Sequence, residues 1–203
     1  EKRSLHGSVL PGIAQVHADG VRREGDVLVG PVPGKPHFFV EAAGVFILPQ
    51  DKEKDLKIAL AAQAAEQGDV PVGCVIVRDG EIVGEGRNRR EENGDATAHA
   101  ELEAIRDACR RLGSWRLHRC TMYVTLEPCP MCAGGIINAR IGTVRYGAKD
   151  DKAGACGSVL NLFEERFNHR PRLYRGPMEA ECGRALRAFF EDLREKDGFS
   201  EEI

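Results

Sequence analysis

The pattern of hydrophobic and polar residues changes near residue 52. Before this point the chain shows little periodicity, and its first 50 residues contain seven Gly and five Pro, a composition typical of irregular or disordered chain. After it, apolar residues recur at helical spacing from about Lys54 to Gly68, which predicts an amphipathic helix. We therefore expect an N-terminal extension over residues 1–52 and one folded domain over residues 53–203.

Shorter patterns within this domain predict alternating strands and helices. Two apolar runs flank Asp79-Gly80, a dipeptide that favours a tight hairpin. Thr97 is the expected N-cap of a helix, and Pro130 is expected to open another. The predicted strands are 74–77, 81–86, 121–126 and 143–146, and the later helices are about 97–112, 130–138, 158–163 and 179–196. This alternation indicates the α/β class, with a three-layer α/β/α domain whose mixed central sheet of about five strands is flanked by helices.

Composition excludes a membrane-spanning chain and leaves nucleic-acid binding to local features. The longest mainly apolar run, residues 37–48, is interrupted by Glu41 and is shorter than the roughly 18 to 20 residues of a spanning helix. The formal net charge is -3, from 29 basic and 32 acidic residues, so no overall positive field indicates RNA or DNA. Because no secretory signal pattern is visible, we expect a cytoplasmic setting for the seven cysteines.

Two short motifs at the starts of predicted helices carry the candidate chemistry. They are His99-Ala100-Glu101 and Pro128-Cys129-Pro130-Met131-Cys132. One imidazole and two thiolates form a ligand set that zinc favours, and three protein ligands leave the fourth tetrahedral position open, as in catalytic sites. A helix N-terminus also favours the thiolate form. We predict one Zn²⁺ bound by His99, Cys129 and Cys132, with Glu101 as the general base and then the general acid of a hydrolysis.

Two other interpretations of these motifs remain open. A Cys-x-x-Cys pair can serve in redox chemistry, although that chemistry has no use for the His-x-Glu about thirty residues upstream. A structural zinc site would need a fourth ligand, which Cys120 or Cys156 would have to supply, and it would leave Glu101 without a role. Cys74, Cys109 and Cys182 lie on predicted strands and helices and are expected to be core residues.

The combination of a His-x-Glu with a later Pro-Cys-x-x-Cys is typical of zinc nucleobase deaminases. From residue 54 to 197 the sequence resembles the bacterial tRNA-specific adenosine deaminases, which make inosine at the wobble position of the anticodon. The zinc motifs alone indicate only the deaminase superfamily, and the later stretches point to tRNA. Besides these motifs, the matching stretches are Pro71-Val72-Gly73, Gly84-Glu85-Gly86-Arg87-Asn88, Val124-Thr125-Leu126-Glu127, Gly147-Ala148-Lys149-Asp150 and Phe167-Asn168-His169-Arg170.

This resemblance implies a cytidine deaminase-like fold, the zinc ligands named above, and a homodimer in which neighbouring subunits complete the RNA site. It also implies that Asn88 hydrogen-bonds the flipped base. Val72 and Ala100 would line the pocket of that base. For Asn88, a simple turn position after a strand is the alternative.

Three further substrate contacts are implied by the same resemblance. Asp150 would contact the nucleotide backbone beside the target, and Phe189 and Phe190 would lie near the substrate cleft. Core packing is an equal alternative for the two phenylalanines. The sequence departs from the family at Asp95-Ala96-Thr97, where the family usually has proline in the middle, and this difference removes no ligand.

A local surplus of positive charge supports a nucleic-acid substrate. Residues 140–175 contain eight basic and four acidic side chains, which suits phosphate contacts, although a solvated mixed face would look the same. The main prediction is zinc-dependent hydrolytic deamination of adenosine in tRNA. The alternatives are a deaminase of guanine, cytosine or a nucleotide, and a non-catalytic zinc-containing RNA-binding subunit.

Overall fold

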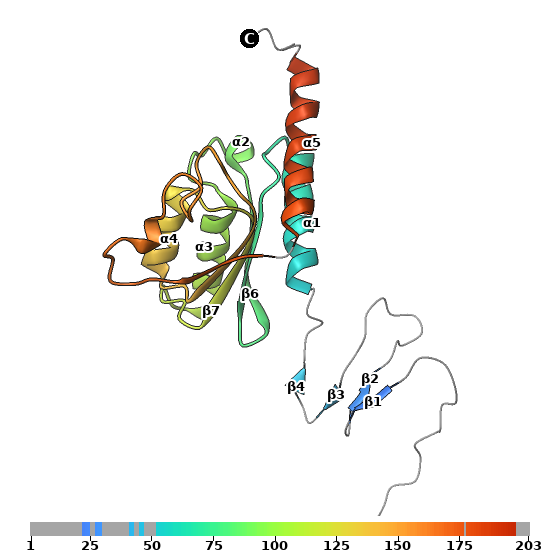
Figure 1. The fold of residues 1–203 in the computed structure, drawn as a ribbon, viewed down its shortest axis with the longest axis vertical. Helices are drawn as coiled ribbons and strands as arrows, with labels where there is room; N and C mark the ends of the chain where they lie inside the picture. Colours follow the sequence, from blue (N-terminus) through green and yellow to red (C-terminus); the bar gives the residue numbers. More distant parts are fainter. Residues whose placement is uncertain are drawn as a thin grey trace, which may run out of the picture. The chain divides into compact units, whose positions relative to one another are not determined.

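The computed structural model describes residues 52–176 and 178–197, together with the backbone of four short strands near the N-terminus (Figure 1). By its internal packing the chain divides into Glu1–Pro49 and Gln50–Ile203, and each unit is described by itself. Most of the predicted extension over residues 1–52 lies outside the described residues, so its irregular character stays a prediction. The four short strands form two antiparallel pairs, β1 (Arg22–Glu24) with β2 (Val27–Val29) and β3 (Glu41–Ala42) with β4 (Val45–Phe46).

A five-stranded mixed sheet forms the middle layer of the second unit. Its first three strands are antiparallel neighbours, whereas its last three run parallel. The predicted hairpin forms at Asp79 and Gly80, whose positive φ angles of 51° and 84° suit a tight two-residue turn. In spatial order the strands are β6 (Glu81–Arg87), β5 (Gly73–Arg78), β7 (Cys120–Leu126), β8 (Thr143–Ala148) and β9 (Arg172–Arg175).

Helices cover both faces of this sheet, as Figure 1 shows. One face carries α3 (Ala100–Leu112) and α4 (Pro130–Ala139), and the other carries α1 (Lys52–Glu66) and α5 (Glu179–Asp197). This arrangement confirms the predicted three-layer α/β/α class. Among the residues described, no helix has the length and apolar character needed to cross a membrane.

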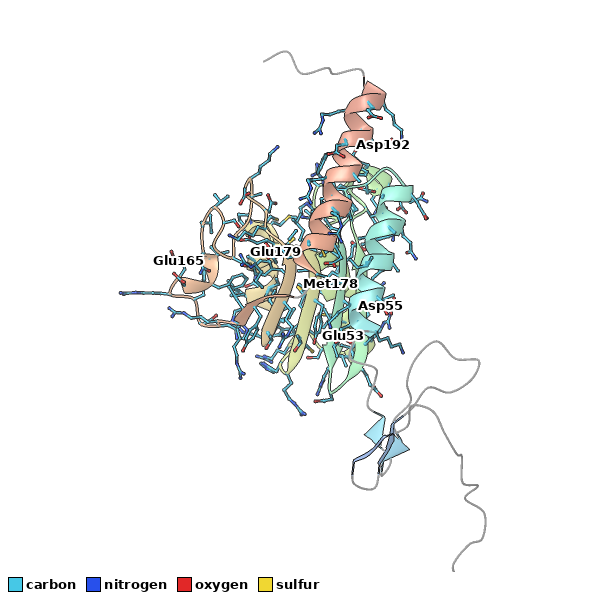
Figure 2. The ribbon with its side chains drawn as sticks, turned by 45° about the vertical axis from the view of Figure 1, so that its right-hand side comes forward. Glu53, Asp55, Glu165, Met178, Glu179 and Asp192 are labelled. Atoms are coloured by element: carbon cyan, nitrogen blue, oxygen red, sulfur yellow. The ribbon has the colours of Figure 1, made fainter. Side chains whose placement is uncertain are left out.

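Acidic side chains occupy the first turns of the two helices on the α1 and α5 face. Glu53 and Asp55 lie at the start of α1, and Glu179 lies at the start of α5 (Figure 2). The positive end of a helix dipole favours negative charge at these positions. The negative charges of these side chains therefore stabilise the N-terminal ends of both helices.

Glycines allow α3 to lie directly on β6. A Cβ atom at Gly86 would stand 2.2 Å from the carbonyl oxygen of Ala100, and one at Gly84 would stand 2.6 Å from that of Ala104. The facing side of α3 consists of small, fully buried residues, Ala100, Ala104 and Ala108. Because neither side carries bulk, the first turn of α3 is fixed closely against the end of β6.

Several elements differ from the sequence prediction. The helix predicted from Thr97 begins at Ala100, because the N–H and the hydroxyl of Thr97 both donate to Asp95 Oδ1 at 2.7 Å and close a turn instead. The helical stretch predicted at 158–163 is a 3-10 turn, η1, at Leu162–Glu164. The short helix α2 (Arg90–Asn93) and strand β9 are absent from the prediction, since four residues are too few to show a period.

Candidate active site

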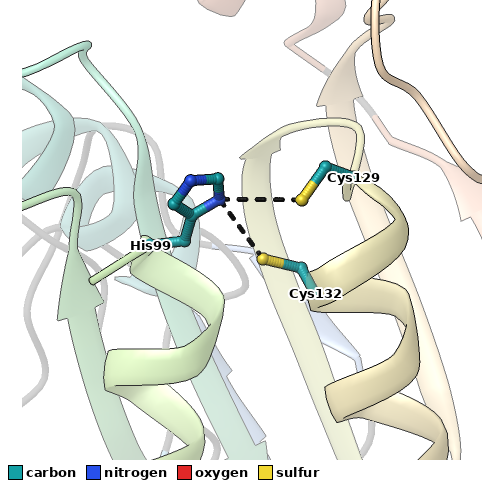
Figure 3. A group of neighbouring side chains, drawn as sticks. All are labelled: His99, Cys129 and Cys132. Atoms are coloured by element: carbon teal, nitrogen blue, oxygen red, sulfur yellow. Dashed lines mark hydrogen bonds between the residues drawn. The ribbon is translucent and has the colours of Figure 1, made fainter. Parts of the chain in front are cut away.

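Two helix N-termini meet at one edge of the sheet and bring three ligand-type side chains together (Figure 3). His99 is the N-cap residue of α3 and Cys129 that of α4, both with extended backbone, and Cys132 lies in the first turn of α4. His99 Nδ1 is 3.7 Å from Cys129 Sγ and 3.5 Å from Cys132 Sγ. All three ligand atoms lie within 4.8 Å of one another. We call this group the His99–Cys129–Cys132 cluster.

The spacing of the cluster fits tetrahedral zinc. Metal bonds of about 2.3 Å to sulfur and about 2.0 Å to nitrogen place tetrahedral ligand atoms roughly 3.5 Å apart, in agreement with the two Nδ1–Sγ distances of 3.7 and 3.5 Å. Over residues 52–176 and 178–197, neither Cys120 nor Cys156 joins this group. The donor set therefore has three members, as in sites that keep one coordination position open.

Hydrogen bonds connect the side chains of the cluster. Hydrogen bonds from Cys132 and His99 lower the pKa of the Cys129 thiol to about 4, although burial opposes the change. The hydrogen bond between the two cysteines, together with burial, raises the pKa of the Cys132 thiol. The hydrogen bond to Cys129 raises the pKa of His99. A cation can replace these protons, because metal ligands must be deprotonated.

Glu101 lies beside the cluster, in the first turn of α3. Its side chain is 4% exposed. Burial raises the pKa of its carboxyl to about 7, and the nearby Cys129 adds to the rise. A carboxyl that titrates near neutrality can both take up and release a proton during a reaction. The site thus combines a group of side chains that could hold a cation with a carboxyl group suited to proton transfer.

Asn88 follows the end of β6 and carries a buried side-chain oxygen that is left without a hydrogen bond among the described residues. Its N–H donates to the Val72 carbonyl at 2.9 Å, and its Nδ2 donates to the Val70 carbonyl at 3.3 Å. Its Oδ1 is buried and has no hydrogen-bond partner in the described part of the chain. A buried acceptor left unpaired costs about 1–3 kcal/mol, so this oxygen is suited to a ligand. The structure places Asn88 and Val72 side by side, and Ala100 is fully buried at the start of α3.

The other sequence-predicted substrate residues lie in two separate places. Asp150 follows β8, and its Oδ1 accepts from the Lys152 and Ala153 N–H groups at 3.0 Å, which closes a turn. Phe189 and Phe190 lie on α5, in the layer across the sheet from α3 and α4, with ring centroids 5.4 Å apart. The structure therefore groups Asn88 with Val72, whereas the phenylalanines belong to the other layer.

The Phe167-Asn168-His169-Arg170 stretch is anchored to the turn that follows α4. Arg140 Nη1 donates to Asn168 Oδ1 at 2.8 Å, and His169 Nε2 donates to the Ile141 carbonyl at 2.7 Å. Phe167 remains 48% exposed. Two of the four side chains of this stretch thus fix the backbone that leads into β9.

Two buried carboxylates near the site were missed by sequence reasoning. Asp69 is fully buried and accepts from the N–H groups of Glu91 at 2.9 Å and Glu92 at 3.2 Å, at the start of α2. Glu127 is 2% exposed and lies two residues before Cys129. A charged residue directly after an apolar strand is a signal for Glu127, because buried acids need partners. Asp69 carries no comparable signal.

Comparison with known proteins assigns the family. Residues 50–194 match the model of the MafB19-like deaminase family. Over 137 residues the chain is 50% identical to the tRNA-specific adenosine deaminase of Bacillus subtilis (strain 168), covering 67% of this chain and 85% of that protein. The chain belongs to the tRNA-specific adenosine deaminase family. The resemblance seen in the sequence is therefore confirmed.

Two further members of this deaminase family extend the match. The tRNA-specific adenosine deaminase of Aquifex aeolicus (strain VF5) is 47% identical over 146 residues, covering 70% of this chain and 96% of that protein. A solved structure from a study of A-to-I editing by deaminases at the wobble position of transfer RNA is 42% identical, with a TM-score of 0.66. It covers 68% of this chain and 100% of its own, which confirms the deaminase fold.

Proposed function

We propose that this chain is a zinc-dependent deaminase that hydrolyses adenosine to inosine at the wobble position of the tRNA anticodon. The observation that carries the proposal is the His99–Cys129–Cys132 cluster, with Nδ1–Sγ distances of 3.7 and 3.5 Å, beside the buried Glu101. It occurs in a chain that is 50% identical to the Bacillus subtilis tRNA-specific adenosine deaminase. One Zn²⁺ per subunit is the expected cofactor.

The residues of the chain divide the reaction between binding and proton transfer. When bound, zinc supplies Lewis acidity that lowers the pKa of water to about 7. With zinc bound, Glu101 would take one proton from that water and deliver it to the ring nitrogen beside the amine. It would then pass the second proton, from the hydroxyl now on the ring carbon, to the departing amine, which leaves as ammonia. Adenosine and water thereby yield inosine and ammonia. Burial of Glu101 at 4% exposure keeps bulk water from this proton.

Substrate recognition is proposed for the residues around the cluster. The unpaired Oδ1 of Asn88 would accept a hydrogen bond from the flipped nucleotide, and Val72 and Ala100 would form apolar walls of its pocket. Asp150 would contact the backbone beside the target. For Phe189 and Phe190, the 41% exposure of Phe190 leaves an aromatic surface for a neighbouring base.

The domain organisation, oligomeric state and cellular location of the protein are part of the same proposed function. Residues 53–203 would form the deaminase domain and residues 1–52 an extension. The RNA-binding surface would be completed in a homodimer, and a tRNA substrate would place the enzyme in the cytoplasm. Exposed basic residues in 140–175, including Lys149 and Lys152, would meet phosphates.

A direct test uses the full chain loaded with zinc and a minimal anticodon stem-loop that carries adenosine at the wobble position. We expect inosine in the RNA, detected by mass spectrometry after nuclease digestion, and one ammonia released per inosine. Free adenosine, guanine and cytidine serve as control substrates. Deamination of guanine or cytidine without inosine in the stem-loop would favour a small-molecule deaminase instead.

A further inference from the structure

Glu127 is the acceptor for four hydrogen-bond donors. Its Oε1 accepts from the N–H groups of Cys156 at 2.8 Å and Ser158 at 3.1 Å. Its Oε2 accepts from the Asp150 N–H at 3.2 Å and from the Ser158 hydroxyl. The side chain is 2% exposed, so its charge is stabilised by these donors rather than by water. All four donors lie in one segment, residues 150–158, which we call the Glu127 loop.

The Glu127 loop also packs against the backbone and the carboxylate of its acceptor segment. A Cβ atom at Gly154 would stand 2.5 Å from the carboxyl carbon of Glu127, so the loop backbone rests on the carboxylate itself. The Ala155 N–H donates to the Pro128 carbonyl at 2.8 Å, and the Glu127 N–H donates to the Ala148 carbonyl at 2.9 Å. Since Pro128 directly precedes Cys129, the loop is attached to the turn that presents a cluster thiolate.

This attachment connects two parts of the proposed site. One is the start of α4, with Cys129 and Cys132. The other is Asp150, whose own N–H donates to Glu127 and whose Oδ1 closes the turn toward Lys152. Over the described residues, Glu127 is outside the metal-type cluster, so it holds neither the metal nor the reacting atoms. Its carboxylate oxygens instead accept hydrogen bonds from the backbone segment that carries Asp150.

We infer that Glu127 is a positioning residue that sets the Glu127 loop, and with it Asp150, at a fixed place relative to the cysteine ligands, so that tRNA binds in register with the reaction centre. The inference rests on the proposed function and adds a residue to its recognition apparatus. Binding of the RNA backbone would depend on Glu127 although Glu127 itself contacts no RNA. A shift of about 1 Å in such a contact is enough to change binding or rate strongly.

The test compares three variants of the zinc-loaded full chain. Glu127→Gln keeps the shape, but in either orientation its NH2 group faces at least one backbone N–H donor. Ser158→Ala removes only one of the donors. Glu164→Gln is the matched control, because Glu164 is exposed, lies outside the Glu127 loop and accepts a hydrogen bond from Asn161 Nδ2 at 2.8 Å.

Inosine formation in the anticodon stem-loop is measured to separate KM from kcat, and zinc content is measured on each purified protein. For Glu127→Gln we expect KM to rise about tenfold, kcat to stay within about threefold, and zinc content to stay at the wild-type value. Ser158→Ala should raise KM about threefold. Glu164→Gln should match wild type in all three quantities.

The outcomes separate the inference from its alternatives. A variant that only folds less well would keep the wild-type KM and lose kcat in proportion to its folded fraction, and that result would overturn the positioning role. Loss of zinc would overturn it as well, by placing the effect on the metal turn. If Glu127→Gln does not fold, a wild-type KM for Ser158→Ala overturns the inference. If the wild-type chain makes no inosine in RNA, the proposed function fails first.

Discussion

The two helical layers of the domain both bury ionisable groups, with opposite consequences. On one face, α3 and α4 begin at the same edge of the sheet, so His99, Glu101 and the two cysteines converge. On the other face, α1 buries Lys57 at 2% exposure, and no ligand-type group forms around it in the described part of the chain. A single buried charged group therefore does not make a functional site. A site forms where two helices begin close together and bring complementary side chains into contact.

The largest effect is expected when the proposed proton carrier, Glu101, is removed from the layer formed by α3 and α4, which we call the converging layer. Glu101→Gln keeps the shape and burial of the side chain but cannot cycle a proton, so we expect kcat for inosine formation to fall about 10³-fold. Zinc content should be unchanged. Single-turnover assays on the anticodon stem-loop measure the loss. Glu103→Gln is the control, because Glu103 pairs with Arg106 outside the site, and a loss of less than tenfold in Glu101→Gln would contradict the catalytic role.

A second change loosens the packing that holds the converging layer in place. A side chain at Gly86 would meet the backbone of Ala100 and Ala104, at 2.2 and 2.5 Å, so α3 must move away from β6. For Gly86→Val we expect a loss of about 2–3 kcal/mol in the free energy of unfolding, measured by urea denaturation, together with weaker zinc retention against a chelator.

The control for this change is Gly142→Ala, whose Cβ would find no atom closer than 3.6 Å. It should unfold at nearly the wild-type urea concentration and retain zinc equally well. Wild-type zinc retention in Gly86→Val would show that the cluster does not depend on the close contact between α3 and β6.

The smallest effect is expected in the layer without a site. Burial lowers the pKa of Lys57 below its usual 10.5, although nearby Cys182 partly offsets the change. Between the folded pKa and 10.5 the unfolded chain binds a proton that the folded chain lacks, so stability from this group rises with pH. Lys57→Met should therefore stabilise the protein by about 1 kcal/mol at pH 7, and the gain should shrink as pH approaches 10.5.

Urea unfolding at pH 7 and near pH 10 checks this sign, with Lys52→Met as the exposed control. Deaminase activity at pH 7 should be unchanged, because α1 contributes nothing to the cluster. A Lys57→Met protein that is less stable than wild type at pH 7 would mean that the buried amine is a net stabilising group, which would reduce the contrast between the layers.

The converging layer could be predicted from the sequence because its chemistry is local. His99 and Glu101 are two residues apart and Cys129 and Cys132 three apart, so each motif is visible in a few letters and only their meeting needs the fold. The exact start of α3 was predicted wrongly, since Thr97 satisfies Asp95 within a turn rather than capping the helix. That choice depends on the extended backbone of His99, which no local pattern reveals.

The roles of the residues that organise the surroundings of the site could not be predicted, because their partners are distant in sequence, although the place of Glu127 directly after an apolar strand is a signal of burial. Glu127 binds donors 23 to 31 positions away, and Asp69 binds N–H groups 22 and 23 positions away. A buried carboxylate is identified by its burial and its donors, and both arise only when the chain is folded. Strand β9, whose four residues show no period, is likewise recognised only in the fold, where Arg172 pairs with Thr143 of β8.

The Asp79-Gly80 turn, at the edge of the sheet opposite the cluster, is useful for protein engineering. There the Asp79-Gly80 turn meets the segment before β7 through an ion pair between Arg119 and Asp79 at 2.7 Å, while the proposed chemical groups follow the other ends of these strands. Exposed turns of this kind accept inserted chain well. This turn is therefore a suitable attachment point for a fluorophore, a purification tag or a fused RNA-targeting module that leaves the deaminase reaction undisturbed.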